Sequence, residues 1–220
     1  MSEPTVFAPK SRDRAYDLFT EGLMSRKIVA GQFISQRELI EIIGLPMAAI
    51  RALIPRLEAE GLIVTVPQRG LQIAHVDVNL IHNAFQFRLM LESYAMAAFV
   101  RDAPDEEITK LREAHEIVLR QGESEVTPEL LRQAQLTDWN FHDRIIDWIA
   151  NDLVSAAYRT NSIKIRLIRQ GEVRIAPQRL LIVMRIHLDI IERMEKRDVE
   201  GAVQALTEHI MAARNRAMNV

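Results

Sequence analysis

The spacing of apolar residues predicts that the first part of the chain is helical. Between about residues 12 and 29, apolar side chains recur every three to four positions, which is the period of a helix with one buried face. Ser35 followed by Glu38 is the pattern of a capping box, so a short second helix should begin there. A third helix of about fifteen residues ends at Gly61 and contains Pro55, where we expect a kink or a short turn that is not α-helical.

The pattern changes to a period of two after the third helix. Residues 62–66 are rich in β-branched side chains, residues 67–70 form a turn, and residues 71–74 alternate again, which predicts a β-hairpin. Three helices with a short turn between the second and the third, followed by a hairpin, make a winged helix-turn-helix. We therefore expect a DNA-binding domain over residues 11–76, preceded by a flexible arm at residues 1–10.

No strand signal returns after residue 76, and residues 77–220 predict a second, all-α domain. Breaks at proline, glycine and Asn-Asp positions divide this domain into helical segments. We expect six helices, over residues 78–101, 105–121, 128–149, 152–170, 178–195 and 198–217. The predicted fold is therefore mainly α, with a winged helix-turn-helix followed by an all-α six-helix bundle that encloses its own core.

Composition and charge narrow the function only slightly. The chain has 220 residues, 48% of them hydrophobic, and it has no cysteine, which excludes disulfides, thiolate metal sites and a cysteine nucleophile. We see no apolar leader and no stretch approaching about eighteen apolar residues, so we expect a soluble, cytoplasmic protein with no membrane partner. The net charge is −2, and residues 1–76 hold nine basic and eight acidic residues. DNA binding must therefore come from a local basic cluster, doubled in a homodimer.

Four arginines in the predicted head are chemically suited to DNA. Arg37 opens the second helix, Arg51 and Arg56 lie on the third, and Arg69 with Gly70 forms the tip of the hairpin. A guanidinium can bind guanine through two hydrogen bonds or pair with a phosphate. Each of these arginines could equally be an ordinary surface residue. Their order along the predicted elements favours contact with DNA.

The same segment resembles a family of bacterial transcription regulators. It is similar to the winged-helix head of GntR-type regulators in the segments Arg37-Glu38-Leu39, Ile43-Gly44, Ile50-Arg51, Arg56-Leu57-Glu58-Ala59-Glu60-Gly61-Leu62 and Arg69-Gly70. The resemblance covers about 65 residues, and it implies that operator DNA is contacted by Arg37, Arg51, Arg69 and Gly70.

The start of the third helix departs from that family. GntR-type heads usually begin this helix with Ser-Arg-Thr-Pro or a close relative, whereas this chain has Pro46-Met47-Ala48-Ala49. Met47 and Ala48 can contact thymine methyl groups, but they cannot read hydrogen-bond patterns. We count both among the expected DNA-contacting residues. One possibility is that the head binds DNA mainly through phosphate contacts and insertion of the hairpin.

Four polar residues lie on otherwise apolar faces of the predicted bundle helices. Asp138 and His142 are four residues apart and therefore share one helix face, together with Phe141. His187 and His209 lie on the apolar stripes of two further helices. Buried polar groups without partners are costly, and a divalent cation would satisfy all four at once. Nitrogen and oxygen donors without sulfur suit Zn²⁺, Ni²⁺, Mn²⁺ or Fe²⁺. The alternative is a polar cluster without metal.

This arrangement also resembles a known effector domain. Asp138-x-x-x-His142, followed by His187 and then His209, is similar to the Asp-x-x-x-His…His…His pattern of the FCD domain. That domain follows the head in the FadR-like branch of GntR regulators. The resemblance extends over about residues 80–215, and it implies that these four side chains hold a divalent metal. In such domains the metal helps to hold a small carboxylate.

Arg88 and two residues of a later helix are candidates for contact with an effector. Arg88 lies on a mostly apolar stripe, and a buried guanidinium needs an anion. That anion could be the carboxylate of an effector or the side chain of Glu92, and the arginine could also extend to the surface. Tyr158 and Asn161 are further candidates for lining the same cavity. The remaining histidines show no convergent partners, and we expect them on the surface or in a linker: His75, His82 and His115.

Two functions fit these features. The first is a homodimeric transcription regulator, not an enzyme, that binds double-stranded operator DNA and responds to a small organic acid at the metal site. Its two heads would bind two half-sites, and the effector would favour one arrangement of the heads. The alternative is a metal-dependent hydrolase of small organic acids, because three histidines and an aspartate with an open position can activate water. Its general base would be Glu92, the only inward candidate.

Overall fold

The computed structural model describes residues 9–168 and 176–218, which fall into two compact units. Among these residues, one unit holds the chain up to Leu80 together with residues 163–168. The other unit holds residues 81–162 and the described residues from Ala176 onward. Helices dominate both units, and the strands within the described ranges all lie in the first. The prediction of a mainly α fold, a winged helix-turn-helix followed by a helical bundle, is confirmed.

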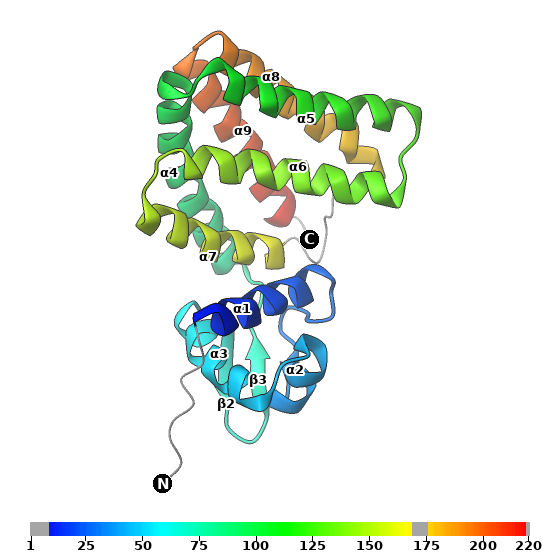
Figure 1. Ribbon diagram of the computed structural model, residues 1–220, viewed down its shortest axis with the longest axis vertical. Coiled ribbons are helices and arrows are strands. Elements are labelled where there is room, and N and C mark those ends of the chain that lie inside the picture. The colour runs from blue at the N-terminus through cyan, green and yellow to red at the C-terminus, as the bar shows by residue number, and fades with distance from the viewer. Residues whose placement is uncertain (1–8, 169–175, 219–220) are drawn as a thin grey trace. The chain divides into compact units, whose positions relative to one another are not determined.

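The first unit combines three helices with a three-stranded antiparallel sheet (Figure 1). Its elements are α1 (Pro9–Met24), β1 (Phe33–Ile34), α2 (Gln36–Ile43), α3 (Met47–Ala59), β2 (Ile63–Val66) and β3 (Gly70–Ile73). β3 is the central strand, and its Leu71 pairs with Thr65 of β2 on one side and with Ile34 of β1 on the other. The predicted hairpin is therefore β2–β3. β1 was not predicted, because two residues are too few to show an alternation.

The capping box predicted at the start of α2 is present. Ser35 Oγ accepts a hydrogen bond from the backbone N–H of Glu38 at 3.1 Å, and Glu38 Oε2 accepts one from the backbone N–H of Ser35 at 2.7 Å. Both bonds satisfy amide groups that the first turn of a helix leaves unpaired. At the other end Gly44 adopts a φ of +72°, which ends α2 and turns the chain toward α3.

The third helix tolerates its internal proline. α3 is α-helical without interruption through Pro55, so the expected turn that is not α-helical is absent. Pro55 is exposed, whereas Leu53, Ile54 and Leu57 on the other face are buried in the core of this unit. The packing of these apolar side chains outweighs the one hydrogen bond that proline cannot donate.

From Val78 onward, the residues that the structure describes form six α-helices in the predicted order (Figure 1). They are α4 (Val78–Asp102), α5 (Asp105–Ser124), α6 (Pro128–Asp147), α7 (Asp152–Ile168), α8 (Leu180–Glu195) and α9 (Val199–Met218), with a 3₁₀ turn at Pro177–Arg179 before α8. In the second unit α8 packs against α5, α6 and α9. This packing brings the inward faces of α6, α8 and α9 together, and these are the faces that carry the predicted metal ligands.

The limits of the two units differ from the predicted domains, residues 11–76 and 77–220. The first unit extends to Leu80, and it includes the end of α7. There Ile163 and Leu167 are buried in the apolar core of that unit. A helix can join two units in this way because its opposite ends expose their apolar faces to different neighbours.

Two further expectations concern the N-terminal arm and the membrane. The predicted arm, residues 1–10, lies outside the described residues except for Pro9 and Lys10, which begin α1. Among the helices of residues 9–168 and 176–218, none combines the length and the hydropathy that crossing a bilayer requires.

Candidate metal centre

The four predicted ligands come together inside the second unit. Asp138 and His142 lie one turn apart on α6, His187 lies on α8, and His209 lies on α9. All four side chains are buried, and one nitrogen or oxygen atom from each lies within 4.8 Å of the others. Nε2 of His187 is 3.3 Å from Nε2 of His209 and 3.6 Å from Oδ1 of Asp138. These atoms therefore face a common point.

The two ring nitrogens of His142 indicate that the four side chains are suited to bind a cation. Its Nδ1 lies 2.7 Å from Oε2 of Glu92, and an ionised carboxylate only accepts, so Nδ1 carries the proton and donates it. In the neutral ring, the form that binds a metal, Nε2 of His142 then presents a lone pair. It is buried and has no hydrogen-bond partner among the described residues. Such an orphaned acceptor is expected where a cation binds, and the carboxylate–histidine pair is the usual way in which a metal ligand is oriented.

Glu92 is the centre of a buried ionic network that sequence reasoning recognised only in part. Besides His142, its carboxylate accepts hydrogen bonds from Arg88 Nε at 2.6 Å and from the Tyr158 hydroxyl at 3.0 Å. Burial raises the pKa of Glu92, but Arg88 and His142 outweigh it and hold that pKa well below its usual range. The carboxylate is therefore charged. Of the alternatives left open for Arg88, the pair with Glu92 is present.

Glu92 links the guanidinium of Arg88 to one of the candidate ligands, because one of its carboxylate oxygens accepts from Arg88 and the other from His142. Burial lowers the pKa of Arg88, but the charge and the hydrogen bond of Glu92, with the charge of Asp138, raise it by more. In turn, the charge of Arg88 contributes to lowering the pKa of His187 and of His209. A buried guanidinium of this kind can also pair with a bound anion.

Two of the three histidines among the candidate ligands are held in the neutral form that can bind a metal. Burial lowers the pKa of His187 well below its usual range, and the neighbouring histidines lower it further. Burial also lowers the pKa of His209, to about 3. Neutral imidazoles offer the lone pair that a metal requires. Asp138, the fourth ligand, accepts a hydrogen bond from Gln135 Nε2 at 3.1 Å, which orients its carboxylate.

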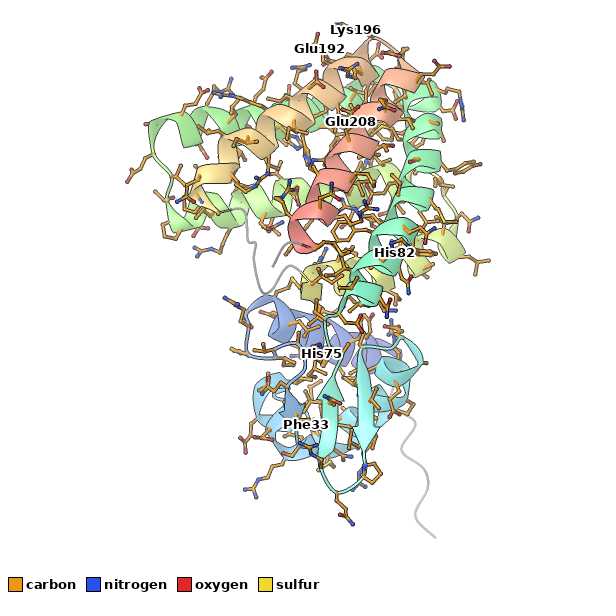
Figure 2. All side chains as sticks on the ribbon, turned by 180° about the vertical axis from the view of Figure 1, so that it is seen from behind. Phe33, His75, His82, Glu192, Lys196 and Glu208 are labelled. Atoms are coloured by element: carbon orange, nitrogen blue, oxygen red, sulfur yellow. The ribbon has the colours of Figure 1, made fainter. Side chains whose placement is uncertain are left out.

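His115 contradicts our expectation of a surface or linker residue. It is fully buried on α5, and its Nε2 lies 3.0 Å from Nδ1 of His187. A signal for its position was available in the sequence. His115 continues an apolar stripe of α5 that is buried in the structure and contains Ile108, Leu111, Val118 and Gly122. The other two histidines outside the ligand set, His75 and His82, are exposed as expected (Figure 2).

Tyr158 and Asn161, the two further candidates for contact with an effector, are both buried on α7, but they have different partners. Tyr158 belongs to the Glu92 network. Asn161 instead donates a hydrogen bond from Nδ2 to the carbonyl oxygen of Ala84 on α4 at 2.9 Å, so its amide ties two helices together. The structure thus brings Tyr158, but not Asn161, into hydrogen-bond contact with the groups around the quartet.

The predicted DNA-contacting residues lie on the surface of the first unit. Arg37 is highly exposed, with its Nε 3.7 Å from Glu41 Oε1, and Arg51 is exposed on α3. Met47 and Ala48 are exposed on the first turn of the same helix. An exposed arginine next to an exposed helix N-terminus can reach phosphates and base edges.

The tip of the hairpin has its own local structure. The guanidinium of Arg69 lies over the ring of Phe33, 4.0 Å from the ring centre; Figure 2 shows Phe33 in this unit. Gly70 adopts a φ of +94°, and a Cβ atom there would lie 2.9 Å from the carbonyl oxygen of Ile34. Only glycine fits that approach. Arg56, by contrast, is packed on Tyr16 and paired with Glu60, so it supports the unit.

Comparison with known proteins identifies the second unit. The FCD domain matches residues 83–212, which is more than half of the chain. The chain belongs to the FCD domain family. Its match to the Nta operon transcriptional regulator of Aminobacter aminovorans is 28% identical and covers 63% of this chain and 64% of that regulator, just under two thirds of its length. The uncharacterized HTH-type transcriptional regulator YdhC of Bacillus subtilis (strain 168) is 24% identical over 81% of this chain and 78% of its own length.

Solved structures share the fold of the whole chain. E. coli McbR/YncC has a TM-score of 0.79 at 15% identity, with 97% of this chain and 99% of that chain covered. A GntR transcriptional regulator from Rhodococcus sp. RHA1 has a TM-score of 0.76 at 12% identity, with 96% and 99% covered. The chain thus carries an FCD domain and shares the fold of these two proteins. Both curated relatives are named as transcriptional regulators, and neither name indicates a hydrolase.

Proposed function

We propose that this protein is a GntR-type transcription regulator that binds double-stranded operator DNA as a homodimer, and that a small organic acid controls the binding from a metal site in the helical bundle. The observation that carries the proposal is the buried quartet of Asp138, His142, His187 and His209, with the unpartnered Nε2 of His142 facing it. Buried polar atoms of this kind are stable when a cation binds them.

The donor set suits a divalent transition metal. Three imidazole nitrogens and one carboxylate oxygen, without sulfur, fit Zn²⁺, Ni²⁺, Mn²⁺ or Fe²⁺. Asp138 and His142 would contribute from α6, His187 from α8 and His209 from α9. Since the four donors come from three helices, metal binding would stabilise the packing of those helices. When bound, the metal supplies a Lewis acid to which an oxygen of the effector can bind.

Charge favours an anionic effector at this place. With the histidines neutral, the carboxylates of Asp138 and Glu92 oppose the guanidinium of Arg88 and a divalent metal, which leaves a net positive charge in a buried site. A small carboxylate would balance that charge. Arg88 Nε is bonded to Glu92, and in this proposal the other nitrogens of its guanidinium bind the carboxylate of the effector. Tyr158 would keep Glu92 in place.

The head offers an exposed surface for DNA. We propose that Arg37, Arg51 and Arg69 contact phosphates or guanines, and that Met47 and Ala48 contact thymine methyl groups. A homodimer would present two heads to two half-sites of an operator. If the effector favours one arrangement of the heads, its affinity and that of DNA are reciprocally linked.

Metal analysis of the purified full-length chain, followed by DNA titrations, tests the proposal. We expect a bound divalent metal, and salt-dependent binding to DNA upstream of the coding region that small carboxylates shift and their neutral amides do not. Arg51→Ala and Arg69→Ala should weaken DNA binding, whereas Arg132→Ala, an exposed arginine of α6, should not. Retention of full affinity by both head variants would refute the DNA assignment. Turnover of the carboxylates would instead point to hydrolysis.

A further inference from the structure

His115 does more than fill space in the core, because its ring makes two specific polar contacts. Its side chain is completely buried between α5 and α8, and both of its ring nitrogens have partners. Nδ1 lies 2.6 Å from the carbonyl oxygen of Leu111, one turn earlier on the same helix. Nε2 lies 3.0 Å from Nδ1 of His187, 72 residues away in the sequence. One side of this ring therefore touches the backbone, and the other touches a candidate metal ligand.

The direction of these hydrogen bonds follows from the backbone carbonyl. A carbonyl oxygen can only accept, so Nδ1 of His115 donates to Leu111. In a neutral imidazole the second nitrogen is then an acceptor, so Nε2 of His115 accepts the proton of His187 Nδ1. With its proton on Nδ1, His187 presents a lone pair on Nε2. That atom faces His209 at 3.3 Å and Asp138 at 3.6 Å, inside the quartet.

His142 provides an internal comparison. There the buried carboxylate of Glu92 accepts the proton of Nδ1 and leaves Nε2 free toward the same quartet. His115 does for His187 what Glu92 does for His142, although one acceptor is a neutral ring and the other is a charged carboxylate. Two ligands from different helices are thus held in the same tautomer by two unrelated acceptors.

Aromatic packing holds the rings of His115 and His187 in their relative orientation. The ring of Phe141 stacks on that of His187, with centres 4.5 Å apart and planes at 26°. It also meets His115 edge to face, with centres 5.6 Å apart. Since Phe141 precedes His142 on α6, the same turn of helix carries one ligand and holds another in place. Rotation of either ring out of its hydrogen bond would lose this packing.

We propose that His115 is a positioning residue that fixes the tautomer and orientation of His187 and thereby sets the metal affinity of the site. This inference rests on the proposed metal function. A leucine of similar size would fill the space but would leave the Nδ1–H of His187 buried without an acceptor. His187 would then favour the other tautomer, in which Nε2–H points into the quartet and opposes metal binding.

The tautomer can be measured without any metal. In full-length, metal-free protein with ¹⁵N-labelled histidine, long-range ¹H–¹⁵N spectra at neutral pH should show His187 protonated on Nδ1. In His115→Leu the proton should move wholly or partly to Nε2, and in His115→Gln, whose side-chain oxygen can accept at a similar reach, it should remain on Nδ1. A wild-type His187 protonated on Nε2, or a tautomer that is the same in His115→Leu, overturns the inference.

Metal titration supplies the second readout. His115→Leu should lose roughly 10- to 100-fold in metal affinity, and His115→Gln should recover most of that loss. Val118→Ala, which shortens a fully buried side chain on the same helix, is the matched control and should keep wild-type affinity. Equal affinity in wild type and His115→Leu refutes the role of His115. If the wild type binds no metal, the proposed function is wrong, and the tautomer measurement still decides the role of His115.

Discussion

Nδ1 of His142 lies 2.7 Å from Oε2 of Glu92, whereas Nε2 of the same ring is buried without a hydrogen-bond partner in the described parts of the chain. The carboxylate thus orients one nitrogen of the ring, and the other nitrogen is left to bind a cation. From this pair we expect His142→Ala to lose the bound metal, together with the thermal stabilisation that the metal gives. Elemental analysis and thermal unfolding with and without chelator measure both effects. His82→Ala removes an exposed histidine and is the control; metal retained at full stoichiometry in His142→Ala would exclude the site.

Glu92→Gln should lower the free energy of unfolding by more than the loss of one hydrogen bond would. The substitution leaves the buried guanidinium of Arg88 without its counter-charge, and loss of one partner from a buried pair costs about 3–5 kcal/mol. It should also lower metal affinity, because a carboxylate no longer orients His142. Urea unfolding and metal titration report the two effects. Glu113→Gln on the exposed side of α5 should change neither, and a fully stable Glu92→Gln would contradict the network.

The metal-free protein should lose stability as the pH falls below the usual histidine range. Burial lowers the pKa of His115, His187 and His209 in the folded state, so the unfolded chain binds more protons once the pH drops below about 6.5. Their contribution is present above pH 6.5 and is lost as the pH falls toward the folded pKa values. Each histidine should add a slope of about 1.4 kcal/mol per pH unit. Urea unfolding between pH 7 and pH 5 measures this slope, and His209→Leu should make it shallower. A slope that is the same in His209→Leu would show that this histidine is not held neutral.

Phe33→Leu should weaken DNA binding without removing a charge. The ring supports the guanidinium of Arg69 at the tip of the hairpin, and such contacts contribute about 0.5–1 kcal/mol at exposed sites. We expect a loss of affinity of a few fold and an unchanged dependence on salt. Arg69→Ala should instead reduce the salt slope by about one phosphate contact. Fluorescence anisotropy over a range of salt concentrations separates the two. An unaffected Phe33→Leu would mean that the stacked position of Arg69 is not the one that binds DNA.

Gly70→Ala should destabilise the first unit more than Gly44→Ala does. Both glycines have positive φ, but a Cβ at Gly70 would lie 2.9 Å from the carbonyl oxygen of Ile34, whereas nothing lies within 4 Å of a Cβ at Gly44. Backbone strain alone costs roughly 1 kcal/mol, and the contact with β1 adds to it. Equilibrium unfolding of the two variants gives the comparison. An equal decrease in the free energy of unfolding for both variants would show that β1 can shift to make room for the Cβ atom.

Much of the site followed from local patterns in the sequence. The four-residue spacing of Asp138 and His142 places them on one face of a helix whatever the rest of the fold does. The apolar stripes around His187 and His209 likewise require those faces to be buried. The capping box at Ser35 and the alternation of the hairpin were recognisable for the same reason. Each depends on hydrogen bonds and periodicity within a few residues.

The partners of these residues could not be read from spacing. His115 was expected on the surface because its acceptor role depends on His187, 72 residues further on, and on how α5 packs against α8. Nor did the sequence predict that Glu92 joins Tyr158 and His142, which lie 66 and 50 residues away. By itself, the sequence determined which faces are buried and which residue types stand on them, because helical periodicity is local. Only the tertiary structure decided which buried donor meets which acceptor, because small rotations and shifts of packed helices move a side chain by more than the length of a hydrogen bond.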